Sequence, residues 1–256
     1  MAHTGRLNER AVPSGVDSLW HVDSGWAVFA GPLGRNALHA HSTAVYLAGL
    51  YDTFQLRIAG GEWLSCRTAI IRAGVDYEFD MAGAPLSVLY VEPNAGSVDT
   101  LAPLVRNGEA VRGAFIGDGD VTPLRHVFEH RPGVAELRAS TDDLLSFSRK
   151  RARRGMDGRV TRALETLQAE ETEHNCVASA ATAAGLSASR FQHLFTSEVG
   201  VPFRRYRRWQ RLRLAIAEAV RGASLTHAAH AAGFADQAHF SRAFRATFGA
   251  PPSRGL

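Results

Sequence analysis

Two stretches of the C-terminal half share one layout: SAATAAGLSASRFQHLF at residues 179–195 and THAAHAAGFADQAHFSRAF at residues 226–244. In each stretch an alanine-rich segment ends at Ala-Ala-Gly, a large apolar residue follows, and a second helical segment begins. Glycine allows the left-handed backbone conformation that a sharp turn between helices needs, and alanine lets two helices approach closely. The layout predicts a helix-turn-helix that is present twice.

The second helix of each unit has an apolar stripe and an opposite polar face when its residues are placed about 100° apart. The residues that point away from the stripe are short, polar or cationic, which is typical of groups that contact a DNA major groove. They are Ser189, Gln192, His193 and Thr196 in the first unit and Ala238, Ser241, Arg242 and Arg245 in the second. For either helix alone the alternative is an ordinary solvated face, and the repetition favours nucleic acid.

Between the two units, apolar residues at helical spacing predict a helix from Pro202 to about residue 221. A helix of that length spans roughly 30 Å, and successive major grooves on one face of DNA lie roughly 34 Å apart. Such a rod could hold two recognition helices in adjacent grooves without a dimer. Its other face carries arginines that are suited to phosphates, or else are paired within the fold: Arg204, Arg205, Arg207, Arg208, Arg211 and Arg213.

The charge is divided unevenly along the 256 residues. Residues 1–130 carry nine basic and fourteen acidic side chains, whereas residues 131–256 carry twenty basic and eleven acidic ones. An acidic half joined to a basic half indicates two domains, of which only the second meets a polyanion.

The first half is rich in β-branched and aromatic segments separated by glycine and proline turn signals, which predicts a small antiparallel barrel or sandwich. The expected strands are Trp26 to Ala30, Leu38 to Leu50, Phe54 to Ile58, Trp63 to Arg72, Tyr77 to Phe79 and Leu86 to Val91. An amphipathic helix is expected from 135 to 148 and a linker at 149–155. The predicted fold class is therefore α+β, with an all-β domain at 1–130, a helix and linker at 131–156, and an all-α domain at 157–256.

Several classes of protein are excluded by composition. Cys66 and Cys176 lie too far apart in the sequence for a disulfide framework or a paired-cysteine metal site. The chain has neither an apolar run of transmembrane length nor a signal peptide, so we expect a cytoplasmic protein without membrane contact. It shows no defensible nucleophilic triad or phosphate loop, and we do not expect an enzyme.

With these features in view, residues 157–253 resemble the DNA-binding domain of the AraC/XylS family of bacterial transcription regulators. The strongest match is SLTHAAHAAGFADQAHFSRAFRATFGAPPS at 224–253. The resemblance places base contacts on the two recognition helices, and the full predicted DNA-binding set is Ser189, Arg190, Gln192, His193, Thr196, Gln237, Ala238, Ser241, Arg242 and Arg245. Ala238 departs from the pattern because its side chain is too small for a polar base contact.

The family commonly joins this domain to a cupin-like barrel that binds an effector or mediates dimerisation, and the segments GRNALHAHS at 34–42 and AIIRAGVDYEF at 69–79 resemble the two cupin motifs. His39 and His41, two apart on a strand, would face the same side. The cupin acidic ligand would fall near Val45 and the last histidine on Tyr77, so no metal and no cofactor are expected. The predicted effector-binding residues are His39, His41, Tyr46, Trp63, Arg72, Tyr77 and Glu78.

The resemblance thus implies a sequence-specific DNA-binding transcriptional regulator, an activator that contacts RNA polymerase. Its control would come from an unknown small effector, or from homodimerisation through the barrel or the 135–148 helix. Two alternatives are also compatible with the sequence: a cupin-type metalloenzyme or metal sensor fused to a DNA-binding domain, and an architectural DNA binder without an effector.

Overall fold

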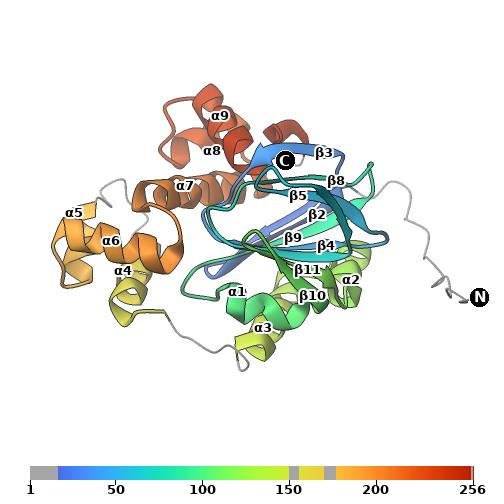
Figure 1. The fold of residues 1–256 in the computed structure, drawn as a ribbon. Helices are drawn as coiled ribbons and strands as arrows, with labels where there is room; N and C mark the ends of the chain where they lie inside the picture. Colours follow the sequence, from blue (N-terminus) through green and yellow to red (C-terminus); the bar gives the residue numbers. More distant parts are fainter. Residues whose placement is uncertain (1–16, 150–155, 170–176, 255) are drawn as a thin grey trace, which may run out of the picture.

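The strands and helices occupy separate halves of the chain, as Figure 1 shows for a computed structural model. The structure describes residues 17–149, 156–169, 177–254 and 256, and the expected linker residues 150–155 lie outside the described residues. An N-terminal sheet-rich domain stands beside a C-terminal helical region, as the composition predicts.

The larger sheet is antiparallel and contributes one wall of the barrel. Its strands, in spatial order, are β1 (Leu19–Val22), β2 (Trp26–Pro32), β9 (Pro85–Val91), β4 (Ala44–Gly49), β7 (Thr68–Ile71), β11 (Ala114–Asp118) and β10 (Arg106–Val111). β4 and β9 pair with Val45 opposite Tyr90. The strand β4 is buried at every residue because both faces of this sheet are covered.

The smaller sheet closes the barrel and has one face toward solvent. Its strands, in spatial order, are β3 (Arg35–His39), β8 (Tyr77–Asp80), β5 (Phe54–Ile58) and β6 (Trp63–Cys66). Along β5 the buried Phe54, Leu56 and Ile58 alternate with the more exposed Gln55 and Arg57. Side chains that alternate in this way fill the barrel with one face and leave the other to water.

Helices cover the outer face of the larger sheet, on the side away from the smaller sheet. They are α1 (Val98–Leu101), the 3-10 turn η1 (Ala102–Leu104), α2 (Thr122–His130) and α3 (Val134–Arg149). Tyr46, Ile70 and Leu89 of the sheet pack in one cluster with Leu124 and Phe128 of α2. The helix expected from 135 to 148 is α3, and Leu137 and Leu145 bury it against the same cluster.

The helical half contains the two units expected from the repeated layout. Its elements are α4 (Gly158–Ala169), α5 (Val177–Ala183), α6 (Ala188–Val199), α7 (Phe203–Val220), α8 (Leu225–Ala231), α9 (Gln237–Phe248) and η2 (Pro252–Arg254). The first helix-turn-helix is α5 with α6 and the second is α8 with α9, and Figure 1 shows them on opposite sides of α7. Gly185 and Gly233 turn each unit with φ of 65° and 71°.

Two expected strands are wrong as single elements. The segment Leu38 to Leu50 is interrupted after His39 and the segment Trp63 to Arg72 after Cys66. In both, the chain crosses from the smaller sheet to the larger one, without a glycine or proline to mark the corner. Sequence reasoning also missed β1, β10 and β11, whose strands lie at or next to an edge of the larger sheet.

Candidate nucleic-acid interface and interdomain pocket

Both recognition helices begin at a side-chain cap, which sets the direction of their exposed faces. Ser187 accepts a hydrogen bond from the Arg190 amide before α6, and Asp236 accepts one from the His239 amide at 2.6 Å before α9. Behind them, Phe191 and Phe195 of α6 are buried, as is Phe240 of α9. Each helix therefore presents one fixed polar face to solvent.

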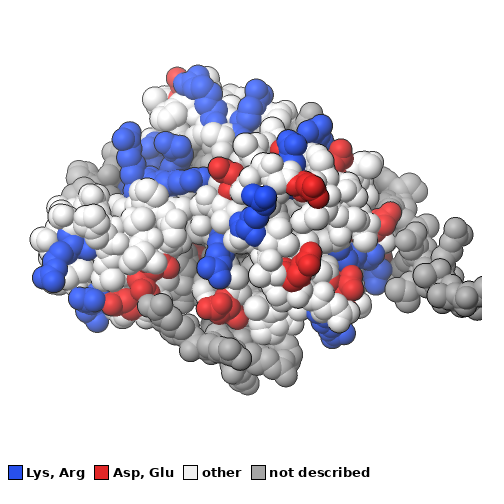
Figure 2. All heavy atoms as spheres, in the orientation of Figure 1, with Lys and Arg blue, Asp and Glu red and all other residues white. Residues whose placement is uncertain are grey.

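The predicted DNA-binding residues lie on those polar faces. All are exposed except Ser241, which is half-buried. Some are already held by neighbours: Gln237 accepts a hydrogen bond from the Thr226 hydroxyl at 2.9 Å, and Thr196 donates to the Gln192 carbonyl at 2.9 Å. Figure 2 shows arginines gathered over the helical half, around α7 and above it.

The arginines of α7 do not form one phosphate-binding face. Arg204 and Arg208 are exposed, whereas Arg205 donates to the Ala40 carbonyl of the barrel at 3.0 Å. Arg211 donates to the Ala232 carbonyl at 2.9 Å and lies over the Phe234 ring. Arg213 is buried. The barrel and the second unit thus occupy one side of α7, and there the arginines stabilise the fold.

Glu92 of the barrel joins the two domains. It follows the last residue of β9, is 1% exposed, and accepts hydrogen bonds from four side chains of α7. These are the Tyr206 hydroxyl at 2.7 Å, Trp209 Nε1 at 2.7 Å, Gln210 Nε2 at 2.8 Å and the Arg213 guanidinium at 2.9 Å. Arg213 also donates to the Asp23 and Ser24 carbonyls. A buried ion pair is costly to break because removing one partner leaves the other charge buried and uncompensated, so these contacts hold α7 on the barrel.

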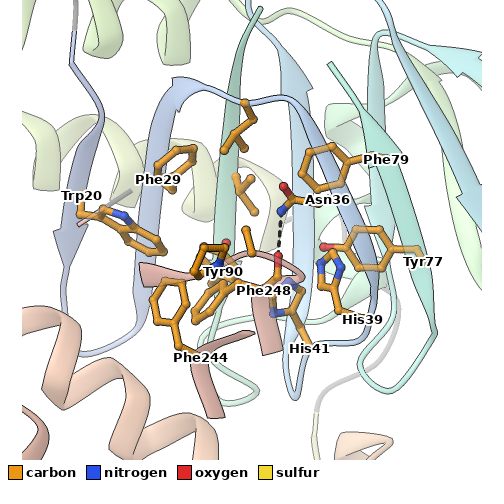
Figure 3. A pocket seen from close by; sticks show the side chains of 14 residues that line it. Trp20, Phe29, Asn36, His39, His41, Tyr77, Phe79, Tyr90, Phe244 and Phe248 are labelled. Carbon is orange, nitrogen blue, oxygen red and sulfur yellow. Dashed lines mark hydrogen bonds between the residues drawn. The ribbon is translucent and has the colours of Figure 1, made fainter. Parts of the chain in front are cut away.

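A pocket opens next to this contact, between the barrel and the end of α9 (Figure 3). It encloses about 40 Å³. Its lining combines both sheets with the second helix-turn-helix: Trp20, Phe29, Leu33, Asn36, His39, His41, Tyr77, Phe79, Val88, Tyr90, Phe244, Phe248, Ala250 and Pro251. The Asn36 side-chain amide donates to the Phe248 carbonyl at 2.7 Å, and the Ala37 amide donates to the Gly249 carbonyl. The wall of the pocket is thus also a contact between β3 and α9.

The two histidines of the pocket are held uncharged. Burial lowers the pKa of His39 to about 4, although the Ala37 carbonyl and nearby carboxylates oppose that shift. Burial, together with the charges of His39 and Arg205, lowers the pKa of His41 well below 6.5. His39 Nδ1 lies 2.7 Å from the Ala37 carbonyl, which can only accept, so Nδ1 carries the proton and Nε2 is left as an acceptor.

The structure brings three of the seven predicted effector residues together in this pocket: His39, His41 and Tyr77. His41 is beyond the end of β3 and not on the strand as expected, yet its ring centroid is 5.0 Å from that of His39. The tyrosine at the cupin histidine position, Tyr77, lies 4.4 Å from His39, centroid to centroid.

The other four predicted residues lie elsewhere. Tyr46 is buried on the outer face of the larger sheet, in the cluster beneath α2, and Arg72 is exposed. Trp63 stands on the outer face of the smaller sheet under the guanidiniums of Arg35 and Arg57. Glu78 forms ion pairs with the same two arginines. The side chains of β8 alternate between the two faces of its sheet, which explains why Tyr77 reaches the pocket and Glu78 does not.

Sequence reasoning missed most of the apolar wall, including Asn36, Tyr90, Phe244 and Phe248. Phe244 lies on the buried apolar side of α9, and no local signal shows that this side continues onto a barrel. Across the part of the chain that the structure describes, no group of three His, Cys, Asp or Glu side chains is placed to hold a metal ion. No helix in the described ranges is long and apolar enough to span a membrane.

The comparisons with known proteins agree with this geometry. Residues 180–255 match a family model described as a helix-turn-helix domain. None of the curated protein sequences matches the chain.

Among solved structures, the chain is similar to an apo point variant of ToxT from Vibrio cholerae, with a TM-score of 0.60 and 12% identity over 91% of this chain and 97% of that chain. It is also similar to wild-type ToxT bound to an unsaturated fatty acid, with a TM-score of 0.57 and 12% identity over 91% of this chain and 95% of that chain. A third similar structure is ToxT bound to (E)-4-(8-methylnaphthalen-1-yl)but-3-enoic acid, with a TM-score of 0.58 and 13% identity over 90% of this chain and 97% of that chain. At these identities the likeness shows a shared two-domain fold. The chain therefore carries an AraC-type helix-turn-helix domain at its C-terminus behind a sheet-rich N-terminal domain, in a two-domain fold that it shares with ToxT.

Proposed function

We propose that this DNA-binding regulator recognises a promoter through α6 and α9, each placed in a major groove. The observation that carries the proposal is the pair of capped helices whose exposed faces hold the polar and cationic residues of the predicted set. The 18 residues of α7 between the units correspond to a rod of about 27 Å. That separation is comparable with the distance of roughly 34 Å between successive grooves.

Different residues would supply the affinity for DNA and the sequence specificity. Exposed cations such as Arg204 and Arg208 of α7 would neutralise phosphates, which makes binding strongly dependent on salt. Gln192, His193 and Arg242 would contact base edges, where an arginine can bind guanine through two hydrogen bonds.

Selection from a random duplex library by the full-length protein tests this proposal. We expect an enriched motif of two blocks whose centres lie about one helical turn, or 10–10.5 base pairs, apart. Footprinting should then protect both blocks in one complex. Binding without any enriched motif would contradict the proposal and support an architectural DNA binder.

A small effector in the interdomain pocket would control this activity. The pocket is lined by the barrel and by α9 together, so a ligand there would contact the domain that senses and the domain that binds DNA. ToxT structures with a fatty acid and with an organic acid show that a similar fold can hold a small molecule. His39, His41 and Tyr77 are the members of the predicted effector set that would touch the ligand.

The remaining roles rest on the family resemblance. We propose activation through contact with RNA polymerase, action in the cytoplasm where promoter DNA is found, and homodimerisation through the barrel or α3. In vitro transcription from the selected promoter separates activation from repression. Sedimentation of the protein alone and on DNA gives the subunit number.

A further inference from the structure

Among the described residues, the wall of the interdomain pocket is largely aromatic and includes no acidic side chain, lysine or arginine. Five of its fourteen lining residues are Phe, Trp or Tyr of the barrel, and two more are phenylalanines of α9. None of the fourteen is an arginine, lysine, aspartate or glutamate. Arg205, the cation that affects His41, donates to the Ala40 carbonyl and does not line the pocket. The site therefore has no fixed charge to balance a charged ligand.

Polar atoms in the wall nevertheless lack partners. Trp20 Nε1, Asn36 Oδ1 and His41 Nδ1 are buried and make no hydrogen bond within the described part of the chain. The Trp20 nitrogen can only donate a hydrogen bond, and the Asn36 oxygen can only accept one. Buried polar atoms are normally hydrogen-bonded, so three that are not, on one pocket, point to a ligand that completes them. Figure 3 shows all three side chains around the same opening.

We infer that the pocket binds a small uncharged aromatic molecule whose polar group both donates and accepts a hydrogen bond, as a phenol hydroxyl does. The aromatic rings of Tyr90, Phe79 and Phe248 would pack against the ligand ring, and the Trp20 indole would donate a hydrogen bond to the hydroxyl oxygen. A carboxylate of the same size would be excluded because it would lose its water without gaining a counter-charge. That such a ligand controls DNA binding rests on the proposed function.

The size of the pocket connects ligand binding to the second recognition helix. About 40 Å³ is well below the ~150 Å³ of an engineered cavity that accepts benzene. A ring can therefore be fully enclosed only if part of the wall moves. Within each sheet the strands are held together by ladders of backbone hydrogen bonds. Phe244 and Phe248 instead belong to α9, whose end is held on β3 by two hydrogen bonds. The ligand should then shift α9, and with it the face that contacts DNA.

Three probes of similar size test the ligand class on the full-length protein without DNA: phenol, toluene and benzoate, measured by calorimetry at neutral pH. We expect phenol to bind most tightly, toluene more weakly because it leaves the polar atoms unpaired, and benzoate at least about tenfold more weakly than phenol. Benzoate binding as tightly as phenol, or no saturable binding of phenol, would overturn the inference.

Two variants locate the site. Trp20→Phe removes Nε1, which has no hydrogen-bond partner among the described residues. The change should weaken phenol binding about threefold to tenfold and leave toluene binding unchanged. Leu33→Trp enlarges a half-buried residue of the wall and should abolish the binding of phenol and of toluene. Leu38→Trp, the matched control at an exposed leucine outside the lining, should leave both affinities unchanged. Equal phenol affinity in the wild type, Trp20→Phe and Leu33→Trp would place phenol elsewhere and contradict the assignment.

A parallel titration of the selected promoter keeps the two proposals separate. Sequence-specific DNA binding without any ligand tests the proposed function alone. If that binding holds and phenol changes the promoter affinity of the wild type but not of Leu33→Trp, the coupling through α9 is supported. Phenol binding that leaves promoter affinity unchanged would overturn the coupling without affecting either the ligand class or the DNA-binding function.

Discussion

Trp209 of α7 donates a 2.7 Å hydrogen bond to Glu92 of the barrel, 117 positions earlier in the chain. The same indole lies 5.3 Å from the Tyr90 ring and 6.1 Å from the Phe248 ring, centroid to centroid. Tyr90 and Phe248 line the interdomain pocket. One tryptophan on the helix between the two DNA-binding units therefore contacts both the barrel carboxylate and the wall of the candidate effector site.

Glu92→Gln should destabilise the protein by about 3 kcal/mol, because it leaves the Arg213 guanidinium buried without its counter-charge. The free energy of unfolding from urea denaturation measures the change. Glu109→Gln, on the exposed edge strand β10, removes the same charge at the surface and should change stability by less than about 0.5 kcal/mol. Equal small effects of the two variants would contradict the structural role of Glu92.

Arg242→Ala should cost about 1–3 kcal/mol of promoter affinity and relax the preference at one base pair, if its guanidinium reads a guanine. Fluorescence anisotropy with the selected duplex and its single-base variants measures both effects. Arg106→Ala, an exposed arginine on β10 of the barrel, serves as the charge-matched control and should leave affinity within error. A uniform loss over all sequences would assign Arg242 to a phosphate instead.

Gly249→Ala should destabilise the fold more than Gly185→Ala. Both glycines have positive φ, 70° and 65°, so alanine at either position costs about 1 kcal/mol in backbone strain. A Cβ on Gly249 would in addition lie 2.4 Å from the Ala37 carbonyl oxygen of the barrel, whereas one on Gly185 would meet nothing within 4 Å. Denaturation of the two variants tests whether α9 approaches the barrel so closely, and equal losses would show that it does not.

Stability should fall as the pH drops from 6.5 to about 4. In this window the unfolded chain binds a proton on His39 that the folded chain does not, because burial holds the folded pKa at about 4. The contribution of His39, on the order of 3 kcal/mol, is fully present above pH 6.5 and lost below the folded pKa. His41, whose pKa is also lowered by burial, adds to the same trend.

His39→Gln should make the dependence of unfolding free energy on pH shallower between 6.5 and 4. His227→Gln, at an exposed position on α8, should leave the slope unchanged. A wild-type slope that is retained in His39→Gln would show that His39 is not the group responsible.

The helical half could be predicted closely because its signals are local. Gly185, Gly233 and the caps Ser187 and Asp236 act on residues within one turn of them, and the 3.6-residue period identified the stripe that contains Phe191. The exposed faces of α6 and α9 follow directly from that period, which is why the positions proposed for DNA contact are on the surface.

The strand arrangement of the barrel and the lining of the pocket could not be predicted from local signals, because both depend on tertiary contacts. The corner after His39 carries no turn signal, and which sheet each strand joins is decided by pairing with distant strands. Asn36 and Phe248 lie 212 positions apart, yet they meet across the pocket. Local sequence was enough to predict the two recognition helices, since helical order arises among neighbouring residues. The contacts by which α9 and Glu92 join those helices to the barrel follow from the folded chain alone, because they depend on how two separately formed surfaces pack together.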